Sequence, residues 1–98
     1  MKKVFLSPEA EESIFEISDF LWIHWSPKVA LNFEQSVLKA FKRIAKNPES
    51  FQFDEKIGAR KYFINKLTVL IYQVRDNKVE IIQAFDARQN YQDKDTWK

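Results

Sequence analysis

Apolar and polar positions follow two different periods along this chain, and the change falls near residue 50. Before it, between Ser7 and Lys46, apolar side chains recur every three or four residues, as they do on one face of a helix. After it, β-branched and aromatic runs at about 60–64, 67–74 and 79–86 predict strands. A similar short run opens the chain at 3–6. The pattern therefore predicts the element order β-α-α-β-β-β.

Serine–proline pairs mark the start of each helix. In Ser7-Pro8 and Ser26-Pro27 the serine can cap free backbone N–H groups, and proline suits the first helical position. Asn47-Pro48 ends the second helix, which is expected from Pro27 to about Lys46. Two helices joined by so short a connection form an antiparallel helical hairpin.

The second half of the chain predicts a three-stranded antiparallel sheet. Asn65-Lys66 and Asp76-Asn77 are expected to be its turns, because Asn and Asp tolerate the positive φ of two-residue hairpins. A loop over 49–59 should be held to the body by Phe51 and Phe53. The fold class is α+β, with the hairpin packed on one sheet face. Residues 1–91 should form one domain and 92–98 a C-terminal tail.

The middle strand is apolar on both of its faces. Thr68, Leu70, Tyr72 and Val74 share one face, whereas Val69 and Ile71 lie on the other with Gln73. Because a helical hairpin covers one face only, the uncovered apolar face is predicted to bind a partner. We expect Ile64, Ile82 and Ala84 to extend it. The alternative is that the loop over 49–59 or the tail folds across this face.

Composition excludes several classes of function. The chain of 98 residues has no cysteine, which excludes disulfides, thiolate metal sites and cysteine nucleophiles. Its one glycine, Gly58, excludes a glycine-rich phosphate loop. No segment is long and apolar enough to cross a bilayer, so we expect a cytoplasmic protein without membrane contact. No metal or other cofactor is predicted.

Net charge is +2, but the charge is unevenly distributed. Counted by Lys, Arg, Asp and Glu, it is −3 over 1–25, +6 over 26–75 and −1 over 76–98. The basic middle could contact an acidic partner or a phosphate backbone. A solvated basic face is the simpler interpretation.

The ordered set of these motifs resembles the RelE/ParE superfamily, the toxins of bacterial type II toxin–antitoxin systems. The resemblance covers residues 3 to about 91 and includes Arg60-Lys61, Tyr72-x-Val74, the Asp76-Asn77 turn and a closing Asp-x-Arg. It implies a toxin neutralised by a cognate antitoxin, whose C-terminal segment wraps the toxin by strand addition or by a helix in a groove. RelE-like members cut mRNA on the ribosome, whereas ParE-like members block DNA gyrase.

One departure separates these two mechanisms. RelE-like nucleases carry an Arg in the middle strand, and Val69 stands at that position here. The late Arg corresponds to Arg88, and Tyr91 stands near the C-terminal Tyr of the nucleases. With the strand Arg missing, the resemblance favours a ParE-like toxin that acts through protein contacts. If the protein were instead a nuclease, Arg88 and Tyr91 would be its catalytic residues.

Other residues carry weaker indications. Arg88 serves either an active role or an ion pair with Asp86 or the antitoxin. Arg60 and Lys61 are expected to pair with a helix acid. Trp22 and Trp25 are expected to be buried against the loop aromatics, with an exposed interface as the alternative. His24, the only histidine, suits the negative end of the first helix.

The sequence thus predicts a plasmid-stabilising toxin of a type II system that binds DNA gyrase. The alternatives are a ribosome-dependent mRNA endoribonuclease and an inactive toxin-derived protein that keeps only antitoxin binding. The predicted antitoxin-binding residues are Val69, Ile71, Ile82 and Arg88. A homodimer or a toxin–antitoxin heterotetramer is the expected assembly.

Overall fold

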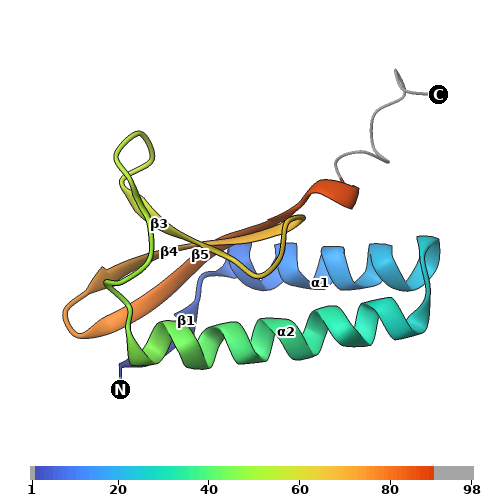
Figure 1. Cartoon of the computed structure of the whole chain (residues 1–98), viewed down its shortest axis with the longest axis horizontal. Helices are drawn as coiled ribbons and strands as arrows, with labels where there is room; N and C mark the ends of the chain where they lie inside the picture. Colours follow the sequence, from blue (N-terminus) through green and yellow to red (C-terminus); the bar gives the residue numbers. More distant parts are fainter. Residues whose placement is uncertain (1, 90–98) are drawn as a thin grey trace.

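Two helices lie side by side on one face of a five-stranded sheet in the computed structural model of this chain (Figure 1). The structure describes residues 2–89. The elements in order are β1 (Lys3–Leu6), α1 (Pro8–His24), α2 (Pro27–Lys46), β2 (Phe53–Asp54), β3 (Ala59–Phe63), β4 (Thr68–Arg75) and β5 (Lys78–Asp86). Apart from the additional β2, this is the order that the sequence predicts.

Both helices begin where the serine–proline pairs predict. The Ser7 hydroxyl oxygen accepts a hydrogen bond from the Ala10 backbone N–H at 3.0 Å, and Ser26 accepts one from Val29 at 3.1 Å. These bonds satisfy backbone donors that have no partner within the helix. The caps set where each helix starts and keep the connection between them to two residues.

The sheet is larger than the sequence predicts. Its strand order is β1-β5-β4-β3-β2, and β1 pairs with β5 in parallel while the other neighbours are antiparallel. The predicted three-stranded antiparallel sheet was therefore incomplete. The four residues of β1 carry no local signal that their partner strand, β5, lies about 75 positions later in the chain. The two-residue β2 is too short to show any period, and it lies inside the segment predicted to be a loop.

The two predicted turns differ in outcome. Asp76 and Asn77 have φ values of 48° and 70°, so the tight turn between β4 and β5 is confirmed. The β3–β4 connection is wider than predicted and spans 64–67. There the Asn65 Oδ1 atom accepts hydrogen bonds from the backbone N–H groups of Leu67 and Thr68, at 2.7 and 2.9 Å.

The core lies between the helical hairpin and the inner face of the sheet. Thr68, Leu70 and Tyr72 of β4 point into it and are fully buried, whereas Val69 and Ile71 are only half-buried. The core side chains from both layers are Ala10, Ile17, Leu21, Ala30, Phe33, Val37, Ala40, Ile44, Leu70, Tyr72, Val79, Ile81 and Ala84. No described element covers the outer face of the sheet (Figure 1).

A β-bulge in β5 determines which side chains reach each face. Ile71 pairs with Gln83 and Tyr72 pairs with Ile81, so Ile82 is the extra residue. Strict alternation would place Ile82 and Ala84 on the same face, but the bulge shifts the alternation and buries Ala84 in the core. The prediction that Ala84 extends the uncovered face was wrong for this reason. The prediction for Ile64 was wrong as well: Ile64 packs against the core, because it lies two residues after Tyr62, which pairs with the buried Leu70.

Among residues 2–89, no helix is long and apolar enough to cross a membrane.

Tyr72 provides a test of this packing. Its hydroxyl donates a hydrogen bond of 2.6 Å to the Pro48 carbonyl oxygen, and burial raises its pKa from 10.0 to about 12. Above pH 10 the unfolded chain releases this proton more readily than the folded chain does, so the free energy of unfolding should fall as pH rises from 10 towards 12. Urea unfolding at a series of pH values measures this slope. In the Tyr72→Phe variant the free energy of unfolding should fall less steeply over the same pH range. An equal slope in both proteins would contradict the raised pKa of Tyr72.

Candidate functional site

The outer face of the sheet carries a continuous row of apolar side chains. Val69 pairs with Phe63 on one side and with Phe85 on the other, so these three residues form a line across three strands. Phe63 is 56% exposed and Phe85 is 48% exposed. Ile71 follows two residues along β4, and Ile82 reaches the same face from the bulge. We call Phe63, Val69, Ile71, Ile82 and Phe85 the open face.

A shallow groove of about 460 Å³ runs across the open face and continues to Ile57. Lys61 is the one charged side chain that lines it, and the Lys61 Nζ atom lies 2.8 Å from the Asp54 Oδ2 atom. That hydrogen bond lowers the pKa of Asp54. The groove is therefore apolar, with a single cation at its edge that already has a carboxylate partner.

The structure brings Val69, Ile71 and Ile82 together and places Arg88 elsewhere. Arg88 follows β5 and lies near the turn between the helices, where its guanidinium stands 5.7 Å from the centre of the Trp25 ring. A small pocket there is also lined by Phe33 and Asn65. The four residues predicted to bind an antitoxin thus occupy two separate surfaces.

Arg88 forms a bidentate ion pair with Asp86. Its Nε and Nη2 atoms donate to the two Asp86 carboxylate oxygens at 3.0 and 2.8 Å, and its backbone N–H donates to Oδ1 at 2.9 Å. The Thr68 hydroxyl donates to Oδ2 at 2.5 Å. This network joins the start of β4 to the end of β5. The ion-pair interpretation of Arg88 is confirmed.

Opposing effects act on the pKa of Asp86. Burial of the carboxylate raises its pKa, but the hydrogen bonds from Arg88 and Thr68 lower it by more, so that this pKa lies below its ordinary value. The side chain of Asp86 has no exposed surface and that of Arg88 is 15% exposed. The Arg88 guanidinium is therefore largely occupied in neutralising a buried charge.

Among the other predicted residues, Phe51 packs as expected, whereas Arg60 and Lys61 have other partners than predicted. Arg60 does not pair with a helix acid: it donates to the carbonyl oxygens of Glu49 and Phe51, because β3 runs beside that loop. Lys61 pairs with Asp54 of β2, which is again not a helix acid. Phe51 packs edge-on against Tyr62, as predicted, with ring centres 4.7 Å apart.

Several aromatic residues are more exposed than predicted. Phe53 is 51% exposed, with the Arg60 guanidinium above its ring. Trp22 and Trp25 are 52% and 53% exposed: Trp22 lies on the side of α1 away from the sheet, and Trp25 caps the end of α1 beside Arg88 and not beside the loop aromatics. Their predicted burial was wrong. His24 does end α1. Tyr91 lies outside the described residues, as does the tail over 92–98.

Phe63 and Phe85 are functional candidates that the sequence analysis missed. Both lie directly beside Val69. Because side chains alternate between the two faces of a strand, counting along β3 would have placed Phe63 on the open face. For Phe85 the count fails without knowledge of the bulge. No cluster of three or more His, Asp or Glu able to hold a metal occurs among residues 2–89.

Comparison with known families agrees with this architecture. The model of the ParE toxin of type II toxin–antitoxin systems, parDE, matches residues 4–91. The chain belongs to the ParE toxin family. It is thus the toxin component of a type II toxin–antitoxin system, within the RelE/ParE superfamily. No curated protein gives a significant sequence match.

Several solved structures share this ParE-family fold. A chain of the chromosomal ParDE system from P. aeruginosa matches with a TM-score of 0.74 and 17% identity, over 88% of this chain and 96% of that one. A copper-bound mutant toxin from Helicobacter pylori matches with a TM-score of 0.61 and 12% identity, over 91% of this chain and 98% of that one. A chain of the YoeB–YefM complex from Staphylococcus aureus matches with a TM-score of 0.54 and 21% identity, over 87% of this chain and 95% of that one. At these identities the likeness establishes the fold.

The Asp86–Arg88 pair predicts a specific response to mutation. Replacing Arg88 by Ala leaves a buried carboxylate without its cation, and should lower the free energy of unfolding by about 3 kcal/mol near neutral pH. The lowered pKa of Asp86 stabilises the wild type above pH 3.8, and this contribution is lost as pH falls below that value. Without Arg88, burial raises the pKa of Asp86 instead. The difference in stability between the two proteins should therefore narrow in acid.

Urea unfolding of both proteins across this pH range measures the difference. Asp86→Asn in the Arg88→Ala background is the control, because it removes the titrating group and should remove the pH-dependent part. If Arg88→Ala lowered the free energy of unfolding by the same amount at neutral pH and below pH 3.8, the ion-pair account would be contradicted.

Proposed function

We propose that this ParE-family toxin is neutralised by an antitoxin segment that covers the open face, and that it acts by binding DNA gyrase. The observation that carries the first part is the row Phe63–Val69–Phe85 on an otherwise uncovered sheet. The second part rests on Val69 itself, which stands where RelE-like nucleases are expected to carry a strand Arg.

The character of the open face supports a protein partner. An apolar face of this extent is costly in water and is typical of an interaction site. The groove beside it has one charged lining residue, and Lys61 is paired with Asp54. An apolar segment can therefore cover Val69, Ile71 and Ile82 without desolvating an unpaired charge. The P. aeruginosa ParDE match is named as a toxin–antitoxin system, and the YoeB–YefM match is named as a complex of two proteins.

The arrangement of cations supports the gyrase mechanism over RNA cleavage. Cleavage at a 2′-hydroxyl needs cations placed to stabilise the charge that develops on the phosphate. Arg88 is held by Asp86, and Lys61 by Asp54. The pair Arg88–Asp86 also lies away from the open face, beside Trp25. Neither cation is free to bind a phosphate beside Val69.

Antitoxin binding is tested by placing a charge on the open face. Ile71→Asp should weaken binding of the antitoxin encoded next to the toxin gene by roughly 30-fold, because a buried interface position then holds a carboxylate. Titration calorimetry measures the affinity. Ile23→Asp is the matched control, since Ile23 is 64% exposed on α1, away from the sheet. Unchanged affinity would contradict the proposal, as would an Ile71→Asp chain that fails to fold because its face was internal.

The cellular target is tested with purified components. The chain should inhibit supercoiling of relaxed plasmid by DNA gyrase, and should leave mRNA intact on translating ribosomes. Site-specific mRNA cleavage that requires the ribosome would overturn the gyrase proposal in favour of an endoribonuclease. Activity in neither assay, with antitoxin binding retained, would identify a toxin-derived protein that has lost its activity.

A further inference from the structure

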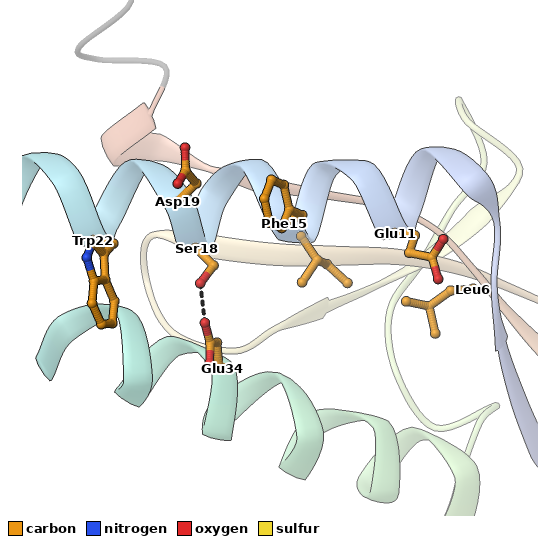
Figure 2. Close-up of a pocket in the computed structure, with 8 residues that line it drawn as sticks. Leu6, Glu11, Phe15, Ser18, Asp19, Trp22 and Glu34 are labelled. Atoms are coloured by element: carbon orange, nitrogen blue, oxygen red, sulfur yellow. Dashed lines mark hydrogen bonds between the residues drawn. The ribbon is translucent and has the colours of Figure 1, made fainter. Parts of the chain in front are cut away.

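A second apolar surface lies on the helical hairpin, on the side away from the sheet. Phe15 and Trp22 of α1 are 69% and 52% exposed, and Leu31 and Leu38 of α2 are 50% and 60% exposed. Figure 2 shows Phe15 and Trp22 along the side of α1 that borders α2. Large apolar side chains that are exposed on both helices indicate a surface that contacts another molecule. We call these four residues the helix seam.

The four residues form two levels along the hairpin. The Ser18 hydroxyl donates a hydrogen bond to the Glu34 carboxylate, which places these residues side by side on the two helices (Figure 2). Because the helices are antiparallel and each rises about 1.5 Å per residue, residues whose numbers sum to about 52 lie level with each other. Phe15 is therefore level with Leu38, and Trp22 with Leu31.

Charges of opposite sign flank the helix seam. At the end of the hairpin that is level with Phe15 and beyond it, α1 carries a group of exposed acids and α2 a group of exposed lysines. The acids are Glu11, Glu12 and Glu16, and the lysines are Lys39, Lys42 and Lys46. A groove of about 500 Å³ runs from Glu11 to Trp22, and Glu34 of α2 also lines it. The surface thus has apolar side chains at two levels and, at one end, an acidic border on α1 and a basic border on α2.

This arrangement is complementary to itself, and we infer that the helix seam binds a second copy of this chain. A two-fold axis parallel to the hairpin turns one copy over onto the other, so that α1 of each lies against α2 of the other. The acidic border of each copy then faces the basic border of its partner. Phe15 meets Leu38 of the second copy, and Trp22 meets its Leu31. The four helices form an antiparallel bundle.

The charges select this axis over the other one available. A two-fold axis in the same plane but across the hairpin would set α1 on α1 and α2 on α2. Because this axis also reverses the direction along the hairpin, Glu11 of one copy would lie against the far end of the partner's α1, and Lys42 against the far end of its α2. That arrangement lacks the complementary charges that fix the register of an interface. The axis along the hairpin is the one that brings opposite charges together at Glu11 and Lys42.

The size of the surface and its location are compatible with a dimer. Helices of 17 and 20 residues are about 25 and 30 Å long. A face two helices wide approaches the roughly 800 Å² that each partner gives to an ordinary specific interface. The helix seam and the open face lie on opposite layers (Figure 1). Dimerisation therefore leaves the proposed antitoxin site accessible and allows two toxin chains with two antitoxins.

The test is a charge-reversal cycle on the full chain without antitoxin, measured by sedimentation velocity up to about 100 μM. The wild type should form dimers. Glu11→Lys or Lys42→Glu alone should each weaken self-association by about tenfold, because the substitution acts at both symmetry-related contacts. The double variant restores opposite charges and should recover most of the wild-type affinity. Glu55→Lys, in the exposed turn between β2 and β3, is the matched control and should have no effect.

Two outcomes would overturn the inference. One is a wild-type chain that stays monomeric at the highest concentration. The other is a dimer that is indifferent to the Glu11 and Lys42 reversals but is broken by Ile71→Asp, which would place the dimer contact on the open face. Neither outcome depends on antitoxin or gyrase binding, so each can be distinguished from a failure of the proposed function.

Discussion

Unequal cover of the two sheet faces is the constraint on which this molecule depends. The hairpin of α1 and α2 packs on the inner face, where Leu70, Tyr72, Val79 and Ile81 are fully buried. The chain has no further described helix for the outer face, yet Val69 and Ile71 on that face are also apolar. A strand that is apolar on both sides implies a second layer of cover. In a toxin of a type II system, the antitoxin is the natural source of that layer.

Two local features determine what each face presents. The bulge at Ile82 changes the alternation of β5 within one strand, so that Ala84 enters the core and Phe85 joins the open face. The Asp86–Arg88 pair then ends the strand and holds it to Thr68 of β4. This second feature occupies the cation that the nuclease hypothesis needed. The same few residues thus complete the fold and favour a toxin that acts through protein contacts.

The sequence predicted the elements better than their assembly. Both helix starts followed from serine–proline pairs, and the Asp76-Asn77 turn from its residue types, because these signals are local. The parallel pairing of β1 with β5 has no local signal, and β2 has two residues. The exposed Trp22 shows a related limit: a helical period identifies the buried stripe but not whether the opposite side is covered. Val69 and Ile71 were placed correctly because β4 is regular around them.

The central claim, that a partner covers the open face, can be tested by methyl NMR with a soluble paramagnetic agent that broadens exposed methyl signals. In the free chain, the signals of Val69, Ile71 and Ile82 should broaden, whereas those of Val79 and Ile81 in the core should not. With the antitoxin bound, the three open-face residues should become protected to the level of the core pair. Open-face methyl signals that broaden equally with and without antitoxin would contradict the account.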